Sequence, residues 1–143
     1  RMETGYLHWG HDISPEENQF QSKLNFAISF KKNIDFIGKE SLLKIKDKND
    51  TKKFVMLTLN DSKPGEPLLL HDEPIYNDKG IIGRTTSGNF SFNFNKNIAF
   101  GYVNSNLSYE ELSKEKIYIE VEKKKYLASI ILRPLNQKNI RNI

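Results

Sequence analysis

The chain has 143 residues, of which 37% are hydrophobic and 28% charged, with a formal net charge of +4 and no cysteine. This composition predicts a folded domain with a core and excludes a disordered chain, a disulfide framework and a thiolate metal site. No apolar run approaches the roughly 20 residues of a membrane-spanning helix. We therefore predict a cytoplasmic protein without a membrane partner. Arg1 opens directly into patterned sequence, which predicts a piece of a longer protein.

The first 50 residues carry signals for both helix and strand. Residues 14–17, Ser-Pro-Glu-Glu, are typical of a helix start, with Ser as the N-cap and Glu three residues later. Apolar residues alternate over 24–30, which predicts a strand with one apolar face. The pattern over 39–46 predicts an amphipathic helix of about two to three turns. Residues 46–53 form a charged linker, which we interpret as the boundary between two structural units.

Beyond Phe54 the pattern predicts β-strands alone. Strands are predicted over 55–59, 74–76, 81–86, 98–102, 117–121 and 126–132. Residues 74–76 and 81–86 are β-rich runs, and the other four show alternating apolar residues. Asn77-Asp-Lys-Gly80 is a turn signal between the second and third of these strands. Gly83 and Gly88 interrupt strand-like sequence, where a bulge, a sharp bend or a close backbone approach is the usual cause. The series predicts a small closed antiparallel β-barrel, organised around the hairpin within residues 73–103.

Two stretches of the barrel region admit both a functional and a structural interpretation. Phe90, Phe92 and Phe94 alternate on one face, which suits either stacking on single-stranded nucleic acid or a barrel core, and we favour the core. Thr85-Thr-Ser-Gly88 is either a phosphate-binding loop or a bend in a barrel strand, and we favour the bend. We therefore expect no nucleic-acid partner.

The histidines form the one metal-site pattern that we considered. His8 and His11 are three residues apart, a spacing that can place two imidazoles together on a helix, and Asp12 could add a carboxylate. Flanking glycines argue against a regular helix there, and no third strong ligand is evident, so we predict no metal site. His71 lies beside a turn, and we expect it to be solvated. The sequence contains no α/β-hydrolase elbow, P-loop or dinucleotide-binding fingerprint.

Six motifs, in order along the chain, are similar to those of a known family. Arg1-Met-Glu-Thr-Gly-Tyr-Leu-His-Trp-Gly-His-Asp12 resembles the Arg-x-Glu-x-Gly-x-x-x-x-Gly-x-Asp segment of folate-dependent aminomethyltransferases. The other five are Asp35-Phe-Ile-Gly-Lys-Glu-Ser-Leu-Leu, Val55-Met-Leu-Thr-Leu, Glu73-Pro-Ile, Gly83-Arg-Thr-Thr-Ser-Gly and Ile98-Ala-Phe-Gly-Tyr-Val. The family includes the glycine cleavage T-protein and the C-terminal half of dimethylglycine and sarcosine dehydrogenases. The resemblance covers residues 1–134 and departs from the family pattern at Phe90-Ser-Phe.

The resemblance implies a fold class and a division into domains. It identifies residues 1–49 as the C-terminal end of the folate-binding aminomethyltransferase core and residues 50–143 as the family's C-terminal β-barrel domain. The implied fold is α+β, a short α/β segment followed by a small antiparallel barrel. In this family a methylene unit passes from an aminomethyl donor to tetrahydrofolate. The implied partners are therefore tetrahydrofolate and that donor, with FAD only if a dehydrogenase domain lies upstream.

The resemblance also implies cofactor-binding residues. Arg1 matches a motif arginine near the folate site, where its guanidinium either binds the glutamate-tail carboxylate or pairs with Glu3 or Asp12. The family's catalytic aspartate lies before the position that matches Arg1. We therefore expect no catalytic residue in this chain and no one-carbon transfer by the chain alone.

Three further positions match the family's folate site. Trp9 and Phe26 fall at aromatic positions, where a ring either stacks on the pterin or benzoyl group or packs in a core. Lys31 falls in a basic cluster that suits an anionic folate tail, or it ends a strand in solvent. The alternative function is a non-catalytic barrel module that binds single-stranded nucleic acid or a protein partner. We also expect self-association of the fragment through the apolar face of residues 1–30.

Overall fold

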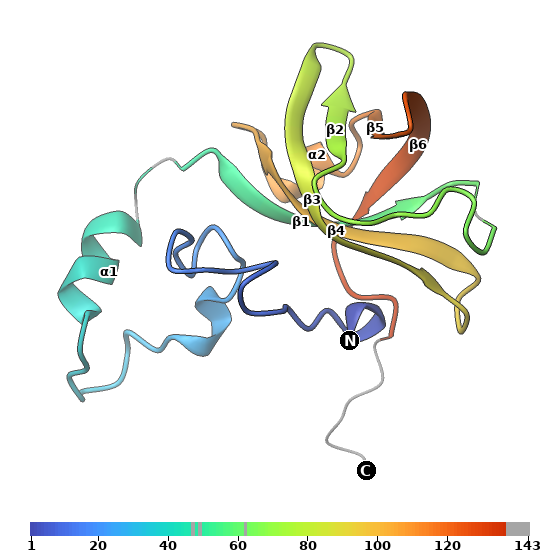
Figure 1. Cartoon of the computed structure of the whole chain (residues 1–143). Helices are drawn as coiled ribbons and strands as arrows, with labels where there is room; N and C mark the ends of the chain where they lie inside the picture. Colours follow the sequence, from blue (N-terminus) through green and yellow to red (C-terminus); the bar gives the residue numbers. More distant parts are fainter. Residues whose placement is uncertain (47, 49, 62, 137–143) are drawn as a thin grey trace.

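The structure is a computed structural model that describes residues 1–46, 48, 50–61 and 63–136. Figure 1 shows an irregular N-terminal segment with one α-helix beside a β-barrel. The segment contains two 3-10 helices and an α-helix: η1 (Met2–Thr4), η2 (Asn25–Ala27) and α1 (Lys39–Lys46). None of the described helices is long and apolar enough to cross a membrane.

Six strands form the barrel: β1 (Lys52–Leu59), β2 (Pro74–Asn77), β3 (Gly80–Ser91), β4 (Lys96–Asn104), β5 (Ile117–Val121) and β6 (Lys124–Ile131). They follow one another in the order β1-β4-β3-β2-β5-β6, and β1 closes the barrel because it pairs with both β4 and β6. All these pairings are antiparallel. The predicted α+β fold with a small antiparallel barrel is confirmed, as is the turn that pairs Asn77 with Gly80.

The barrel interior is the larger of two apolar cores. Its buried members are Val55, Leu57, Leu59, Leu69, Ile75, Ala99, Val103, Leu112, Ile117, Ile119, Val121, Ala128 and Ile130. Apart from Leu69, in the loop before β2, and Leu112, in the helix Tyr109–Leu112, they come from alternate positions of the strands, as expected when one face of each strand points inward. The barrel therefore has a core of its own, without help from the N-terminal segment.

The second core joins the N-terminal segment to the outside of the barrel. Phe54, Phe100 and Tyr102 lie on the outer face of β1 and β4, where their rings meet edge to face at centroid distances of 5.4 and 5.6 Å. Met2 packs against this group. Because β1 and β4 are covered on both faces, nearly all their residues are buried. Met2, with Leu7 packed beside it, thus attaches the start of the chain to the barrel by apolar packing.

Gly83 and Gly88 mark close approaches of the chain, one of the three causes that the sequence left open at these positions. A Cβ atom on Gly83 would lie 1.9 Å from the Tyr102 carbonyl oxygen of β4. A Cβ atom on Gly88 would lie 2.6 Å from the Leu69 carbonyl carbon. Both distances are far below a van der Waals contact, so a side chain at either position requires backbone movement.

The strand predicted over residues 24–30 is wrong. Asn25–Ala27 form the 3-10 helix η2, in which the Ala27 amide donates a hydrogen bond to the Leu24 carbonyl at 3.1 Å. A strand needs a neighbouring edge, and the closed barrel leaves none for this segment. The helix expected from Ser14 is also wrong, because residues 15–23 form only isolated turns, although Glu17 accepts from the Ser14 amide at 2.9 Å as in a capping box.

The helix predicted over residues 39–46 is confirmed as α1, which has no buried residue and lies apart from the barrel in Figure 1. A second helix, α2 (Tyr109–Leu112), was missed although Ser108 and Glu111 form a capping box. The core position predicted for the phenylalanine stripe is wrong, since the half-buried Phe90 belongs to neither apolar core. Phe92 is 79% exposed and Phe94 is 39% exposed, because both lie in the β3–β4 turn.

Candidate functional site

The buried carboxylate of Asp12 is the centre of the candidate site. It lies in a turn where the His8 carbonyl accepts the Asp12 amide at 2.8 Å and the His11 amide at 3.2 Å. Gly10, with φ of +86°, gives this turn the left-handed residue that its backbone requires. The turn directs the Asp12 side chain onto the barrel, where it has no exposed surface.

Four donors surround the Asp12 carboxylate. One oxygen accepts from Arg1 Nη1 and from the His8 amide, both at 2.8 Å. The other accepts from the hydroxyls of Thr86 at 2.6 Å and Ser87 at 2.7 Å. A carboxylate has about four acceptor sites, so all of them are occupied. The arrangement suits an anchor between the N-terminal segment and β3, not a group that exchanges protons or binds a further ligand.

A β-bulge in β3 explains how the hydroxyls of the consecutive residues Thr86 and Ser87 both reach one carboxylate oxygen of Asp12. In a regular strand, neighbouring side chains point to opposite faces of the sheet. The pairing of β3 with β4 shifts between Thr85 and Ser87, which leaves Thr86 as the extra residue. The bulge turns Thr86 toward the side where Ser87 already points. The bend predicted at residues 85–88 is therefore present, and its hydroxyls bind Asp12.

Arg1 and Tyr102 complete this anchor. Arg1 Nη2 donates to the Ser87 hydroxyl at 2.7 Å, and Arg1 Nη1 also donates to the Tyr6 carbonyl at 3.1 Å. The Tyr102 hydroxyl donates to the Asp12 carbonyl at 2.8 Å. Burial raises the pKa of Tyr102 well above its usual range, and the nearby carboxylates of Glu17 and Asp12 raise it further. Of the two structural pairings considered for Arg1, the structure shows the one with Asp12.

Glu3 forms a second contact with the barrel, at the β3–β4 turn. Its carboxylate accepts hydrogen bonds from the Ser91 hydroxyl and, at 2.8 Å, from the Asn93 side chain. These two bonds, the one from Ser91 first, lower the pKa of Glu3. Arg1, Glu3 and Phe90 also line a cavity of about 280 Å³. This cavity is the recess that adjoins the motif arginine.

The four predicted cofactor-binding residues do not line a common cavity among those described. Arg1 borders the 280 Å³ cavity, whereas Phe26 borders a separate, mainly apolar groove of about 600 Å³. Trp9 is 65% exposed and Phe26 is 82% exposed, so neither ring packs in a core. Lys31 is exposed just beyond η2. Their role in binding a cofactor stays a prediction.

The apolar groove beside Phe26 contains one partly buried cation. Lys23 donates to the Leu132 carbonyl at 3.1 Å, and its ammonium lies 4.5 Å from the centre of the Tyr109 ring. Burial lowers the pKa of Lys23, and the negative charge of Glu110 opposes this change. The groove therefore combines exposed apolar surface with a single ammonium at its edge.

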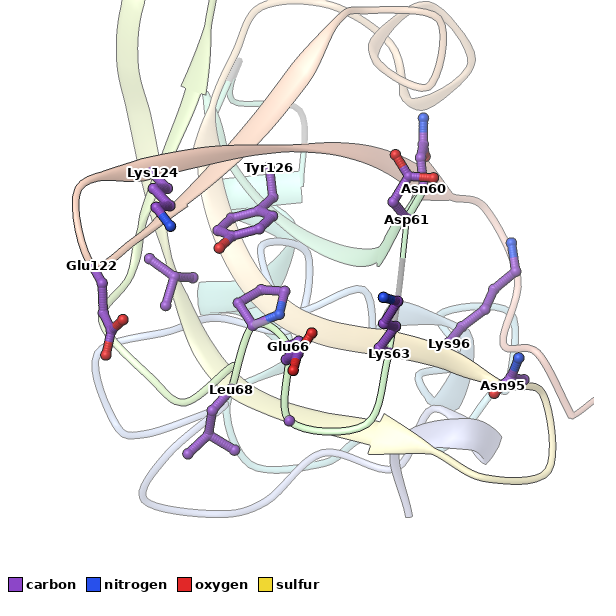
Figure 2. A pocket seen from close by; sticks show the side chains of 13 residues that line it. Asn60, Asp61, Lys63, Glu66, Leu68, Asn95, Lys96, Glu122, Lys124 and Tyr126 are labelled. Carbon is purple, nitrogen blue, oxygen red and sulfur yellow. The ribbon is translucent and has the colours of Figure 1, made fainter.

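The largest of the described clefts, of about 880 Å³, lies at one mouth of the barrel, and none of the predicted residues lines it. Figure 2 shows Glu122 and Lys124 on one side of it, Asp61 and Lys63 on the other, and Glu66 between them. Because lysines and carboxylates alternate around the cleft, its charge favours neither an anion nor a cation. We therefore place no functional site there.

Sequence reasoning missed the role of Thr86, Ser87 and Tyr102 as partners of Asp12. Both ends of this network lie within family motifs, the first at residues 1–12 and the second at 83–88. Each motif was visible, but their contact joins residues 74 or more positions apart, and local patterns do not report such pairings. The fold brings the two motifs together.

Comparison with known proteins identifies the family. The family model described as "Glycine cleavage T-protein C-terminal barrel domain" matches residues 52–136, more than half of the chain. The chain belongs to the glycine cleavage T-protein family. Dimethylglycine dehydrogenase from Homo sapiens is 34% identical over 137 residues, which cover 94% of this chain and 15% of that protein. Aminomethyltransferase from Listeria welshimeri is 34% identical over 134 residues, which cover 94% of this chain and 35% of that protein.

A solved structure supports the same fold. The glycine cleavage system aminomethyltransferase T from Bartonella henselae superposes with a TM-score of 0.79 at 24% sequence identity. The superposition covers 96% of this chain and 37% of that protein. The chain thus spans between about one seventh and just over one third of the length of these three relatives. The family resemblance inferred from the six motifs is confirmed.

Proposed function

We propose that this chain is part of a protein that transfers a one-carbon unit from an aminomethyl donor to tetrahydrofolate. The observation that carries the proposal is the family match, which extends over 94% of the chain to relatives named aminomethyltransferase and dimethylglycine dehydrogenase. Tetrahydrofolate is the implied cofactor, with FAD added if a dehydrogenase domain belongs to the same protein. We retain residues 1–49 and 50–143 as the proposed division between folate-binding core and barrel domain.

The geometry supports a contribution to the site, not a complete site. Small-molecule sites are typically about 300–1,000 Å³ and enclose most of their ligand. The cavity beside Arg1, at about 280 Å³, is smaller than that range and open. Trp9 and Phe26 present exposed rings that suit stacking, and Lys31 presents a cation that suits an anionic tail. Folate bound here would need further contacts from parts of the longer protein.

The exposed apolar surface of the N-terminal segment supports the same interpretation. Ile37, Phe26 and Ile34 expose 105%, 82% and 70% of their surface, and no residue of α1 is buried. We propose that the rest of the longer protein covers this surface, and that the isolated chain self-associates through it. The cytoplasmic location stays a proposal, since the rat and human relatives are named mitochondrial.

The proposal is tested by comparing the longer protein with the 143-residue chain in one assay. With tetrahydrofolate and an aminomethyl donor, we expect the longer protein to form 5,10-methylene-tetrahydrofolate and the chain alone to form none above the uncatalysed background. Holding two reactants together accounts for about 7–11 kcal/mol of barrier reduction, and a partial pocket cannot hold both. Product from the chain alone would refute its assignment as a partial site. No product from the longer protein would refute the function.

Substitution of Arg1 in the longer protein tests its predicted role in folate binding. We expect Arg1→Ala to weaken tetrahydrofolate binding by about ten- to a hundredfold, the effect of losing one charge-assisted hydrogen bond. Because Arg1 also holds Asp12, a matched Ser87→Ala variant is needed, which loses an anchor hydroxyl and keeps the guanidinium. Equal affinity losses in the two variants, measured by calorimetry, would assign Arg1 to structure alone.

A further inference from the structure

All three histidines of the chain lie in one cluster, although the sequence separates them by up to 63 positions. His8 and His11 come from the turn that carries Asp12, and His71 comes from the loop before β2. The ring centroids of His8 and His11 are 4.6 Å apart, and those of His11 and His71 are 6.5 Å apart. The tertiary fold therefore supplies a third imidazole to the pair that is visible in the sequence.

The turn at residues 8–12 accounts for the first pair. The His8 carbonyl accepts the amides of both His11 and Asp12, so the chain completes about one helical turn over this stretch. The two imidazoles lie on the same side of that turn and stack with only 11° between their planes. The Asp12 carboxylate already has four donors and is therefore not a ligand for this cluster.

His71 is oriented by a neighbouring carboxylate. Its Nδ1 lies 2.8 Å from Asp72 Oδ2, and the other carboxylate oxygen of Asp72 faces Arg84 at 3.4 Å. When a carboxylate accepts the Nδ1 proton of an imidazole, the Nε2 lone pair is left for another partner. Carboxylates hold the metal-binding histidines of many proteins in this way. His71 thus has the outer partner that a metal-binding imidazole requires.

We propose that His8, His11 and His71 together bind one divalent transition-metal ion of the zinc class. In a tetrahedral zinc site with Zn–N distances of about 2.0–2.1 Å, the ring centroids lie roughly 5 Å apart. The observed spacings of 4.6 and 6.5 Å bracket that value. As the side chains stand, no group of three ligands among the described residues is arranged to hold a metal ion. All three imidazoles are exposed, so they rotate into position without disturbing the core.

Bound metal would link the same two parts of the molecule that Asp12 joins. His8 and His11 belong to the N-terminal segment, whereas His71 belongs to the barrel unit. An ion held by all three would therefore oppose detachment of the N-terminal segment. Because the ion binds the folded arrangement better than the unfolded chain, it raises the melting temperature in proportion to the logarithm of its concentration.

The test uses the tag-free chain of residues 1–143, since an affinity tag would add histidines. Calorimetric titration with Zn²⁺ is expected to show one ion per chain, and the melting temperature is expected to rise by several degrees and fall again with a chelator. Co²⁺ serves as an absorption probe of the ligand set. We expect His71→Ala to weaken binding at least tenfold and Asp72→Asn to weaken it by about tenfold.

Two controls make the result decisive. Glu16→Ala removes an exposed carboxylate of the same segment and should leave Zn²⁺ affinity unchanged. Circular dichroism should show that the histidine variants keep the wild-type fold, because all three side chains are exposed. Unchanged affinity in His71→Ala would overturn the proposal by showing that the ion binds His8 and His11 alone or elsewhere. Absence of binding to the wild-type chain at millimolar Zn²⁺ would overturn it as well.

Discussion

Replacement of Asp12 by Ala is expected to destabilise the attachment of the N-terminal segment by about 3 kcal/mol. Removing one partner from a buried ion pair typically costs about 3–5 kcal/mol, and the lower end applies because Arg1 is 36% exposed and becomes hydrated. The hydroxyls of Thr86 and Ser87 lose the same acceptor, and Ser87 is buried. The His8 amide loses its acceptor too, so the loss is shared by four donors, not by the guanidinium alone.

The location of the damage distinguishes this prediction from general unfolding. The barrel has its own core, so it should keep its structure while residues 1–46 separate from it. Limited proteolysis of Asp12→Ala is expected to remove the N-terminal segment rapidly and leave a barrel fragment, and urea unfolding should become broader. Glu16→Ala, in the same segment but exposed, should behave as wild type. An unchanged proteolysis pattern in Asp12→Ala would show that the apolar contacts of Met2 and Phe100 suffice for attachment.

Replacement of Gly83 by Ala is expected to cost about 3 kcal/mol or more and to act on the barrel itself. The new Cβ would lie 1.9 Å from the Tyr102 carbonyl oxygen and 2.8 Å from its carbonyl carbon. Both are backbone atoms in a paired strand, so β3 and β4 must separate locally to relieve the contact. Hydrogen bonds of the ladder around Arg84 and Tyr102 would be lost with it.

Gly80 offers a matched control for this substitution. It lies in the same hairpin with φ of +137°, but no atom lies within 4 Å of the Cβ that an alanine would add. Gly80→Ala should therefore cost about 1 kcal/mol, from backbone strain without a steric clash. Chemical unfolding of the two variants separates these effects. If Gly83→Ala were no more destabilising than Gly80→Ala, the close approach of β3 and β4 would not control barrel stability.

The sequence by itself determined the elements whose signals are local. Alternating apolar residues, together with two β-rich runs beside a turn signal, located the six strands, and the pattern over residues 39–46 located α1 at its observed bounds. The turn at Asn77–Gly80 was also predicted, and a close approach at Gly83 was one of three alternatives, because each depends on a residue type with a distinct backbone preference. Six ordered motifs were sufficient to infer the family, since their order and spacing are themselves sequence properties.

Only the tertiary structure decided where several local patterns lie in the molecule. Residues 24–30 alternate as a strand does, yet the closed barrel has no free edge for them, so they form η2 instead. Phe92 and Phe94 alternate as a core strand does, yet the β3–β4 turn falls on them and exposes both rings. In each case the competing information is the position of other strands, which a short window of sequence does not contain.

The candidate site shows the same division most clearly. The sequence contained Arg1 and Asp12 in one motif and Thr86 and Ser87 in another, but nothing local indicated that the bulge in β3 brings them into contact. Nothing in the sequence likewise indicated that His71 lies beside His8 and His11. Contacts between distant segments depend on strand order and barrel closure, which arise from packing over the whole chain. The sequence therefore gives the chemical type of each side chain, and the tertiary fold determines which side chains it contacts.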